Sequence, residues 1–155
     1  MADLTVWRIT HRRWAKSAFS GEGARLAGGR FNSVGVPAVY TSATRSLAML
    51  EILVQVDHRA WLDEHVAIPA AFDDRLVEVA GAAALPSGWD SVPDTEVATA
   101  FGDAWQRGRR SLVLRVPSVI VPGEHNYLIN PEHPDFARVT IGAATPVRFD
   151  PRLAP

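Results

Sequence analysis

The order of strand-like and helix-like segments is the feature that most constrains the fold of this chain. Helices are expected at 44–57 and 94–107, and between and around them lie short apolar runs typical of strands. These runs are 4–9, 38–41, 66–72, 76–79, 111–116, 119–121, 139–141 and 147–149. Because strands and helices do not alternate regularly, the sequence predicts a mixed α+β fold rather than a parallel sheet with crossover helices.

Local signals set the limits of the two expected helices. Ser42 or Thr44 can cap the first helix, which is expected to end near Asp57. The second helix is expected to begin at Asp94, after Pro93, and to stop at Gly108. The apolar faces are predicted to consist of Leu47, Leu50, Leu53 and Val54 in the first helix and of Val97, Phe101, Ala104 and Trp105 in the second.

Composition limits the class of protein. The 155 residues are 47% hydrophobic and 21% charged, which fits a single domain spanning 1–155 with its own core. No run of about 18 apolar residues could span a membrane, and the N-terminal residues do not resemble a secretory signal. The absence of cysteine excludes disulfides, thiolate metal sites and a cysteine nucleophile. We therefore expect a cytoplasmic protein without membrane contact.

The charge balance argues against direct binding of nucleic acid. The formal net charge is −1, whereas neutralising phosphates requires a basic excess. An RNA-binding or RNA-cleaving protein remains the alternative from another class, because several basic residues could share one face. These are Arg8, His11, Arg12, Arg13, Lys16, Arg107, Arg109 and Arg110.

The segment 21–35 is unusually rich in glycine, since it holds five of the eleven glycines, and it is predicted to be a loop. A dinucleotide fingerprint starting at Gly21 fails at its third glycine, and no P-loop motif is present. The remaining motif is Gly28-Gly29-Arg30-Phe31-Asn32. Arg30 can clamp a phosphate or carboxylate that the glycines allow to approach, or it can be a surface arginine beside a glycine turn.

Four further polar residues stand among apolar neighbours. Tyr40 is either a core tyrosine or a ligand contact, and Glu51 faces either solvent or a polar cleft in which its carboxylate would meet a cation. Ser118 is predicted within an apolar strand, and Asn126 is predicted to open a turn. The Glu-His pairs at 124–125 and 132–133 lack an HExxH pattern, so no metal site is predicted.

Taken in order, these segments resemble the RES domain, the toxin half of bacterial Xre–RES toxin–antitoxin pairs. The likeness runs from Trp7 to about Phe149, and Phe31 departs from it where tryptophan is more usual. The family is named after an Arg, a Glu and a Ser, which match Arg30, Glu51 and Ser118. The segments that carry the likeness are Trp7-Arg8-Ile9, Gly28-Gly29-Arg30-Phe31-Asn32, Pro37-Ala38-Val39-Tyr40-Thr41-Ser42, Leu47-Ala48-Met49-Leu50-Glu51, Pro117-Ser118 and Asn126-Tyr127-Leu128-Ile129-Asn130-Pro131.

The resemblance implies an ADP-ribosyltransferase-like fold and an enzyme that consumes NAD without a metal. Glu51 would stabilise the cation left on ribose when nicotinamide departs. Arg30 and Arg8 would hold the phosphates, and Tyr40 would stack on a ring of NAD. Ser118 and Asn126 would line the nicotinamide pocket. Catalytic roles are thus expected for Arg30, Glu51 and Tyr40, and NAD contacts for Arg8, Arg30, Tyr40, Ser118 and Asn126.

The resemblance leaves the acceptor of ADP-ribose open. Water or phosphate as acceptor would deplete cellular NAD, whereas a protein acceptor would make the chain a mono-ADP-ribosyltransferase. The resemblance also implies a cognate Xre-type antitoxin, expected to cover the cleft between Arg30 and Glu51. A homodimer is left open.

Overall fold

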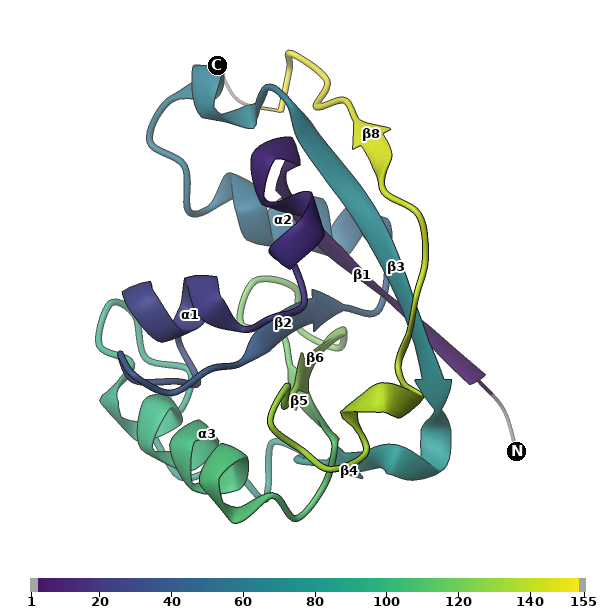
Figure 1. Cartoon of the computed structure of the whole chain (residues 1–155). Helices are drawn as coiled ribbons and strands as arrows, with labels where there is room; N and C mark the ends of the chain where they lie inside the picture. The colour runs from purple at the N-terminus through teal and green to yellow at the C-terminus, as the bar shows by residue number, and fades with distance from the viewer. Residues whose placement is uncertain (1–2, 154–155) are drawn as a thin grey trace.

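The computed structural model describes residues 3–153 and contains a mixed sheet flanked by helices (Figure 1). This architecture confirms the predicted α+β class. The helices are α1 (Glu22–Ala27), α2 (Arg45–Leu53) and α3 (Glu96–Gly108), with 3-10 turns η1 (Arg12–Ser17), η2 (Arg59–Leu62), η3 (Asp74–Leu76) and η4 (Phe136–Arg138). The strands are β1 (Asp3–His11), β2 (Val39–Ser42), β3 (His65–Asp73), β4 (Val77–Val79), β5 (Val113–Pro117), β6 (His125–Ile129), β7 (Thr140–Ile141) and β8 (Thr145–Val147).

The sheet consists of two halves joined at a narrow seam. Its strand order is β4-β5-β6-β2-β1-β3-β7, with β8 also paired to β3, and only β4 and β5 run parallel. β1 and β3 pair along nine residues each, but β1 meets β2 at a single pair, Trp7 with Ser42. Figure 1 shows β1 and β3 running at a steep angle to β2. The two half-sheets therefore diverge next to Trp7 and Ser42.

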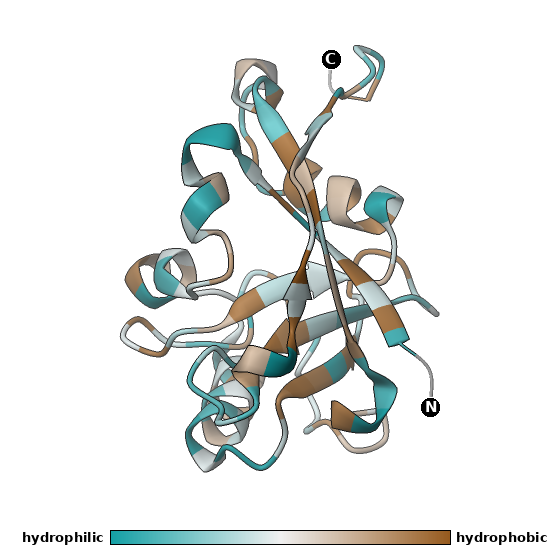
Figure 2. Ribbon diagram, turned by 45° about the vertical axis from the view of Figure 1, so that its right-hand side comes forward, coloured by the Kyte–Doolittle hydropathy of each residue, from teal (hydrophilic) through white to brown (hydrophobic). Residues whose placement is uncertain are grey.

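Apolar clusters hold the helices on the sheet. α2 packs on β1 and β3 through Ala48, which lies with Ile9 and Ala67. α3 packs on β5 and β6 through Ala98 and Trp105. A third cluster, on the opposite face, is built around Phe72 and Tyr127 and is closed by residues that follow η1. Figure 2 shows hydrophobic residues interrupting polar ones along the central strands, as expected where one face of a strand is buried.

Several predicted elements need correction. The segment 119–121 forms bends rather than a strand, and Ser118 follows β5 instead of lying within a strand. Asn126 lies in β6, a strand that the sequence did not predict, and does not open a turn. The glycine-rich segment is not entirely a loop, because Gly21 adopts a left-handed conformation and α1 follows it directly.

The helices are also shorter and differently oriented than predicted. α2 ends at Leu53 rather than near Asp57, and α3 begins at Glu96 because Asp94 accepts a hydrogen bond from the Glu96 backbone N–H instead of entering the helix. Leu50 and Val54 are exposed, and so are Val97 and Ala104 of α3. Buried small and polar residues of α3 take the place of part of its predicted apolar face: Ala98, Gly102, Asp103 and Gln106.

Candidate functional site

Glu51 lies at the centre of a hydrogen-bonded cluster that spans the seam. Its Oε1 accepts from Asn126 Nδ2 at 2.6 Å and from Ser118 Oγ at 3.3 Å. The Oδ1 of Asn126 accepts from Ser42 Oγ at 2.7 Å, which fixes the orientation of the amide so that its NH₂ faces Glu51. The Glu51 carboxylate is therefore held by side chains of β6 and of the loop after β5 instead of extending freely into solvent.

Ser118 directly follows the last residue of β5, and the loop after the strand fixes the direction of its hydroxyl. The Ser118 hydroxyl accepts from the backbone N–H groups of Ile120 and Val121, each at 3.1 Å, while it donates to Glu51. The Ser118 N–H donates to the carbonyl of Glu124, which closes the loop between β5 and β6. The hydroxyl proton is therefore directed toward the carboxylate, and Glu51 Oε2 has no hydrogen-bond partner within residues 3–153.

Arg8 is directed across the gap where the half-sheets diverge. It follows the single β1–β2 pair, and its Nη1 donates to the backbone carbonyl of Tyr40 at 3.0 Å. Its Nε is buried without a partner, and burial lowers the pKa of its guanidinium to about 10. No carboxylate in the described part of the chain pairs with Arg8. The positive charge of Arg8 is therefore not compensated by a carboxylate among the described residues.

Tyr40 joins the sheet to the turn that carries Arg30. Its hydroxyl accepts from the Phe31 N–H at 3.0 Å and donates to Asn32 Oδ1 at 2.6 Å. Burial raises the pKa of this hydroxyl far above its ordinary value, so it stays protonated and able to donate. The hydroxyl is thus occupied within the protein, while the ring contacts the apolar cluster under α3.

The Arg30 side chain is held by the loop that precedes α3. Its Nη1 donates to the carbonyls of Trp89 at 3.2 Å and Ser91 at 2.9 Å. Gly29 is required at its position, because a Cβ there would lie 2.6 Å from the Tyr40 hydroxyl. Both contacts of the guanidinium use neutral carbonyls, so its charge is not neutralised by a carboxylate.

The structure thus brings the six predicted residues into two linked groups. Glu51, Ser118 and Asn126 form one group, and Tyr40 joins Arg8 to the turn of Arg30 in the other. β2 links them, because Tyr40 and Ser42 are two residues apart and therefore lie on the same face of the strand. The two groups together hold one carboxylate and two guanidinium groups, and these guanidinium groups donate to backbone carbonyls.

Other residues of the site escaped prediction as individual contributors. Ser42 was considered only as a helix cap, although it orients Asn126. Asn32 stands in the quoted glycine motif, and its amide group joins Tyr40 to the carbonyls of Ala24 and Val36. Asp103 of α3 binds the backbone and side chain of Ser33. A polar residue on the expected buried side of a helix is the only signal that could have indicated Asp103.

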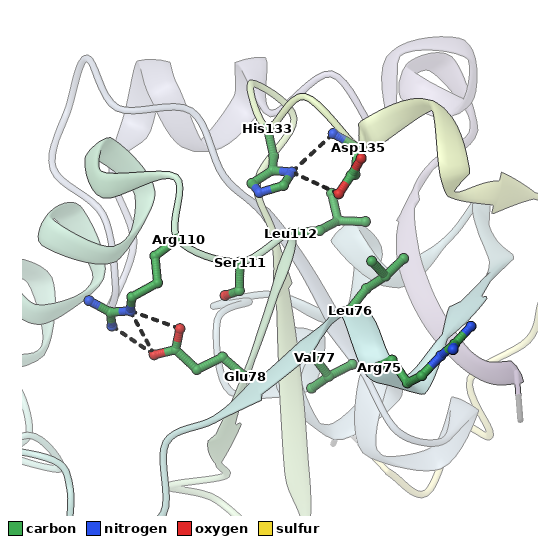
Figure 3. A pocket seen from close by; sticks show the side chains of 9 residues that line it. All are labelled: Arg75, Leu76, Val77, Glu78, Arg110, Ser111, Leu112, His133 and Asp135. Carbon is green, nitrogen blue, oxygen red and sulfur yellow. Dashed lines mark hydrogen bonds and ion pairs between the residues drawn. The ribbon is translucent and has the colours of Figure 1, made fainter. Parts of the chain in front are cut away.

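A hollow elsewhere on the molecule does not coincide with this site. It has a volume of about 150 Å³ and lies between β4, β5 and the loop at His133 (Figure 3). Arg110 is paired there with Glu78 and Arg75 with Asp73, so these charges are compensated within the protein. The volume is also smaller than the roughly 300 Å³ of a typical ligand pocket.

The basic face that an RNA partner would need is partly neutralised. Arg12 pairs with Glu64 and Arg110 with Glu78, and Arg8 is buried at the seam.

Within residues 3–153 no cluster of three potential ligand side chains could hold a metal ion. The helices in the same part of the chain are all too short or too polar to cross a membrane.

Comparison with known proteins places this geometry in context. A family model described as the RES domain matches residues 5–150. The "Prs ADP-ribosylating toxin" of Sphingobium sp. is 38% identical over 154 residues, covering 96% of each chain. A "Toxin Res" from Yersinia enterocolitica is 35% identical over 152 residues, covering 97% of this chain and 99% of the relative.

A solved structure shares the fold. A chain from the crystal structure of the Mycobacterium tuberculosis MbcT-MbcA toxin-antitoxin complex superposes with a TM-score of 0.74 at 20% identity, covering 93% of this chain and 84% of that chain. At this identity the likeness shows a shared fold, which agrees with the expected mixed α+β domain.

Proposed function

Because the chain belongs to the RES domain family, we propose that it is the toxin of a toxin–antitoxin pair and that it cleaves the nicotinamide–ribose bond of NAD. We further propose that residues 1–155 act as one RES domain. The observation that carries the proposal is the Glu51 carboxylate, which Asn126 and Ser118 hold through Oε1 while Oε2 has no hydrogen-bond partner among residues 3–153. Curated relatives named as toxins, one of them ADP-ribosylating, support it.

The chemistry follows from the charges in the cleft. When the bond between ribose C1′ and the pyridinium nitrogen breaks, its electron pair leaves with nicotinamide, and positive charge develops on the ribose ring. Glu51 would stabilise that charge and accept a hydrogen bond from a ribose hydroxyl through Oε2. Water then attacks C1′ and releases a proton to solvent, or a phosphate dianion attacks through an unprotonated oxygen and releases none. Nicotinamide leaves as a neutral molecule, so no residue has to protonate it.

The remaining site residues would bind the substrate. Arg30 and Arg8 are cations without a carboxylate partner, and guanidinium groups suit the diphosphate of NAD. Tyr40 would present its ring to NAD while its hydroxyl stays bound in the turn. Ser118 and Asn126 would line the nicotinamide pocket and keep Glu51 in place.

The proposal is tested by following NAD with purified protein in phosphate buffer and in phosphate-free buffer. Glu51→Gln keeps the shape of the side chain but removes its charge, and the loss of such transition-state stabilisation lowers the rate by a factor of about 10² to 10³. Glu96→Gln, on the exposed surface of α3, is the matched control and should keep the wild-type rate. Equal rates in the wild type and Glu51→Gln would contradict the proposal, whereas dependence on phosphate would identify the acceptor.

Transfer of ADP-ribose to a protein is the second candidate. The name of the Sphingobium relative, a Prs ADP-ribosylating toxin, favours it, since the two chains align over almost their full lengths. Incubation with labelled NAD and cell lysate distinguishes the two reactions. Label on one protein band indicates transfer, whereas labelled small molecules alone indicate breakdown.

We also propose a protein partner that blocks the site. The structural neighbour comes from a toxin-antitoxin complex, and a cognate antitoxin of the Xre type would cover the cleft between Arg30 and Glu51. Full NAD cleavage by the purified complex would refute this arrangement. Gel filtration of the free toxin would show whether it forms a homodimer.

A further inference from the structure

One face of α3 contacts the turn that carries Arg30 at three neighbouring positions. Thr99 Oγ1 donates to the backbone carbonyl of Arg30 at 2.8 Å. Gly102 allows the helix to approach the turn, because a Cβ at that position would lie 1.8 Å from the carbonyl oxygen of Phe31. Asp103 reaches the end of the turn at Ser33. These positions lie along one side of the helix, so α3 forms a continuous support beneath the turn.

Asp103 makes the most demanding of these contacts. Its side chain is buried, with the residue only 8% exposed, and both of its carboxylate oxygens are bound by Ser33. Oδ1 accepts from the backbone N–H at 2.8 Å, and Oδ2 accepts from the hydroxyl. The ion pairs within residues 3–153 do not include Asp103.

A buried carboxylate without a cationic partner is costly unless its hydrogen bonds compensate. The geometry of Asp103 concentrates those bonds on Ser33, which follows Arg30 by three residues. The negative charge of Asp103 also reaches Tyr40, where it helps to raise the pKa of the hydroxyl, and the charge of Arg30 acts on the same hydroxyl in the opposite direction. Asp103 and Arg30 therefore both lie close enough to Tyr40 to affect the pKa of its hydroxyl.

The segment before α3 fixes the other end of the Arg30 side chain. The carbonyls of Trp89 and Ser91 bind its guanidinium, while Thr99 binds its backbone carbonyl. Backbone and side chain of Arg30 are thus both positioned by the segment 89–103, about 60 to 70 residues away along the chain. Without these contacts a glycine-flanked turn would sample many conformations.

We propose that Asp103 is a positioning residue, which holds the Gly29–Ser33 turn on α3 so that Arg30 is preorganised to bind the diphosphate of NAD. This inference rests on the proposed NAD-cleaving function and extends it to a residue outside the cleft. Asp103 acts through Ser33 and touches no substrate. Because it affects how the substrate is held, its loss should change KM more than kcat.

The test compares four variants by NAD-cleavage kinetics and thermal unfolding. Asp103→Ala removes both hydrogen bonds, and we expect KM for NAD to rise about tenfold while kcat stays within about twofold. Asp103→Asn should restore KM to within about threefold, since its amide can accept from the Ser33 N–H and donate to the Ser33 hydroxyl. Thr99→Val removes only the bond to the Arg30 carbonyl and should raise KM in the same direction.

Gln106→Ala is the matched control on the same helix. Gln106 is buried, but its side chain binds Glu132 and not the turn. We expect it to lower the unfolding temperature and to leave KM unchanged. Should Asp103→Ala fail to fold, Ser33→Ala takes its place, because it removes the hydroxyl that donates to Asp103 Oδ2 and should also raise KM. A KM unchanged in Asp103→Ala and in Ser33→Ala, or raised as much in Gln106→Ala as in these variants, would overturn the proposal.

Failure of this inference differs from failure of the proposed function. If the wild type cleaves NAD and Glu51→Gln does not, the function stands, and unchanged KM values in the α3 variants overturn only the role of Asp103. If the wild type neither cleaves nor transfers from NAD, the proposed function itself is refuted, and the role of Asp103 falls with it.

Discussion

The closest approach between α3 and the Arg30 turn gives a prediction whose size follows from the structure. In Gly102→Ala the new Cβ would lie 1.8 Å from the Phe31 carbonyl oxygen, 2.6 Å from its carbonyl carbon and 2.7 Å from its Cβ. Ordinary contact begins at 3.4 Å, so helix and turn would have to separate by about 1.6 Å. Neither neighbour yields easily, because two of the three atoms belong to the backbone.

Overpacking of this kind costs about 3 kcal/mol at the upper end of its usual range, and alanine in place of glycine returns about 1 kcal/mol of helix stability. The net loss of about 2 kcal/mol corresponds to a fall of roughly 4–8 °C in the unfolding temperature of a chain of this size. Thermal unfolding followed by circular dichroism measures the shift. NAD kinetics should also show a raised KM, since the turn carries Arg30.

Gly108→Ala is the control for this experiment, being the same substitution in the same helix. A Cβ at Gly108 would meet no atom within 4 Å, and its backbone does not require glycine. We expect its unfolding temperature to stay level or to rise by a few degrees, given the better helix propensity of alanine. Equal unfolding temperatures for the two variants would refute the close packing of α3 on the turn.

Two further predictions concern the seam between the half-sheets. Ser42→Ala frees the Asn126 amide to turn away from Glu51, so kcat/KM for NAD cleavage should fall about tenfold. The control is Ser46→Ala, because the Ser46 hydroxyl contacts only Thr44 among the described residues, and it should leave kcat/KM unchanged. Equal kcat/KM values for the two variants would show that Ser42 does not act on Glu51 through Asn126. The pKa of His125 is lowered from its ordinary value of 6.5, mainly by burial and also by the positive charge of Arg115. As the pH falls below 6.5, the unfolded chain therefore binds a proton at His125 more readily than the folded protein does. The free energy of unfolding should therefore fall as the pH decreases below 6.5. Urea titrations at pH 5 and 7 measure this fall, which should be smaller in His125→Gln than in the wild type. An equal fall in both proteins would show that His125 is not responsible.

Features that depend on neighbours in sequence were predictable. The cap of α2 is one of the two residues expected, since Thr44 Oγ1 accepts from the Leu47 N–H at 3.1 Å. β1, β2 and β3 lie within a residue or two of the predicted runs, because alternating apolar residues reflect burial of one face. Such signals require only the few residues that form the element.

The sequence did not predict β6 and α1, because both contain residues that are typical of turns and loops. β6 contains Asn126, a residue typical of turns, although here its amide binds Glu51 and Ser42. α1 follows directly on a left-handed glycine in a segment so rich in glycine that a loop was the natural prediction. The face of Glu51 stayed ambiguous for the same reason, because solvent and a polar cleft both favour a carboxylate. Its partners Ser118 and Asn126 are 67 and 75 residues away, beyond the range of any local pattern.

The position of the site follows from the way the sheet is divided. β1 and β2 share one residue pair, so on either side of Trp7 and Ser42 the two strands are not joined by a regular ladder of backbone hydrogen bonds. Arg8 fills that gap by donating to the Tyr40 carbonyl, and the cost is visible in its lowered pKa and in the buried Nε without a partner. A phosphate bound beside the guanidinium would favour its charged form. In the function that we propose, NAD would bind at this seam, and the single pair between β1 and β2 would explain why Arg8 and the chain of hydrogen bonds from Ser42 through Asn126 to Glu51 occur beside it.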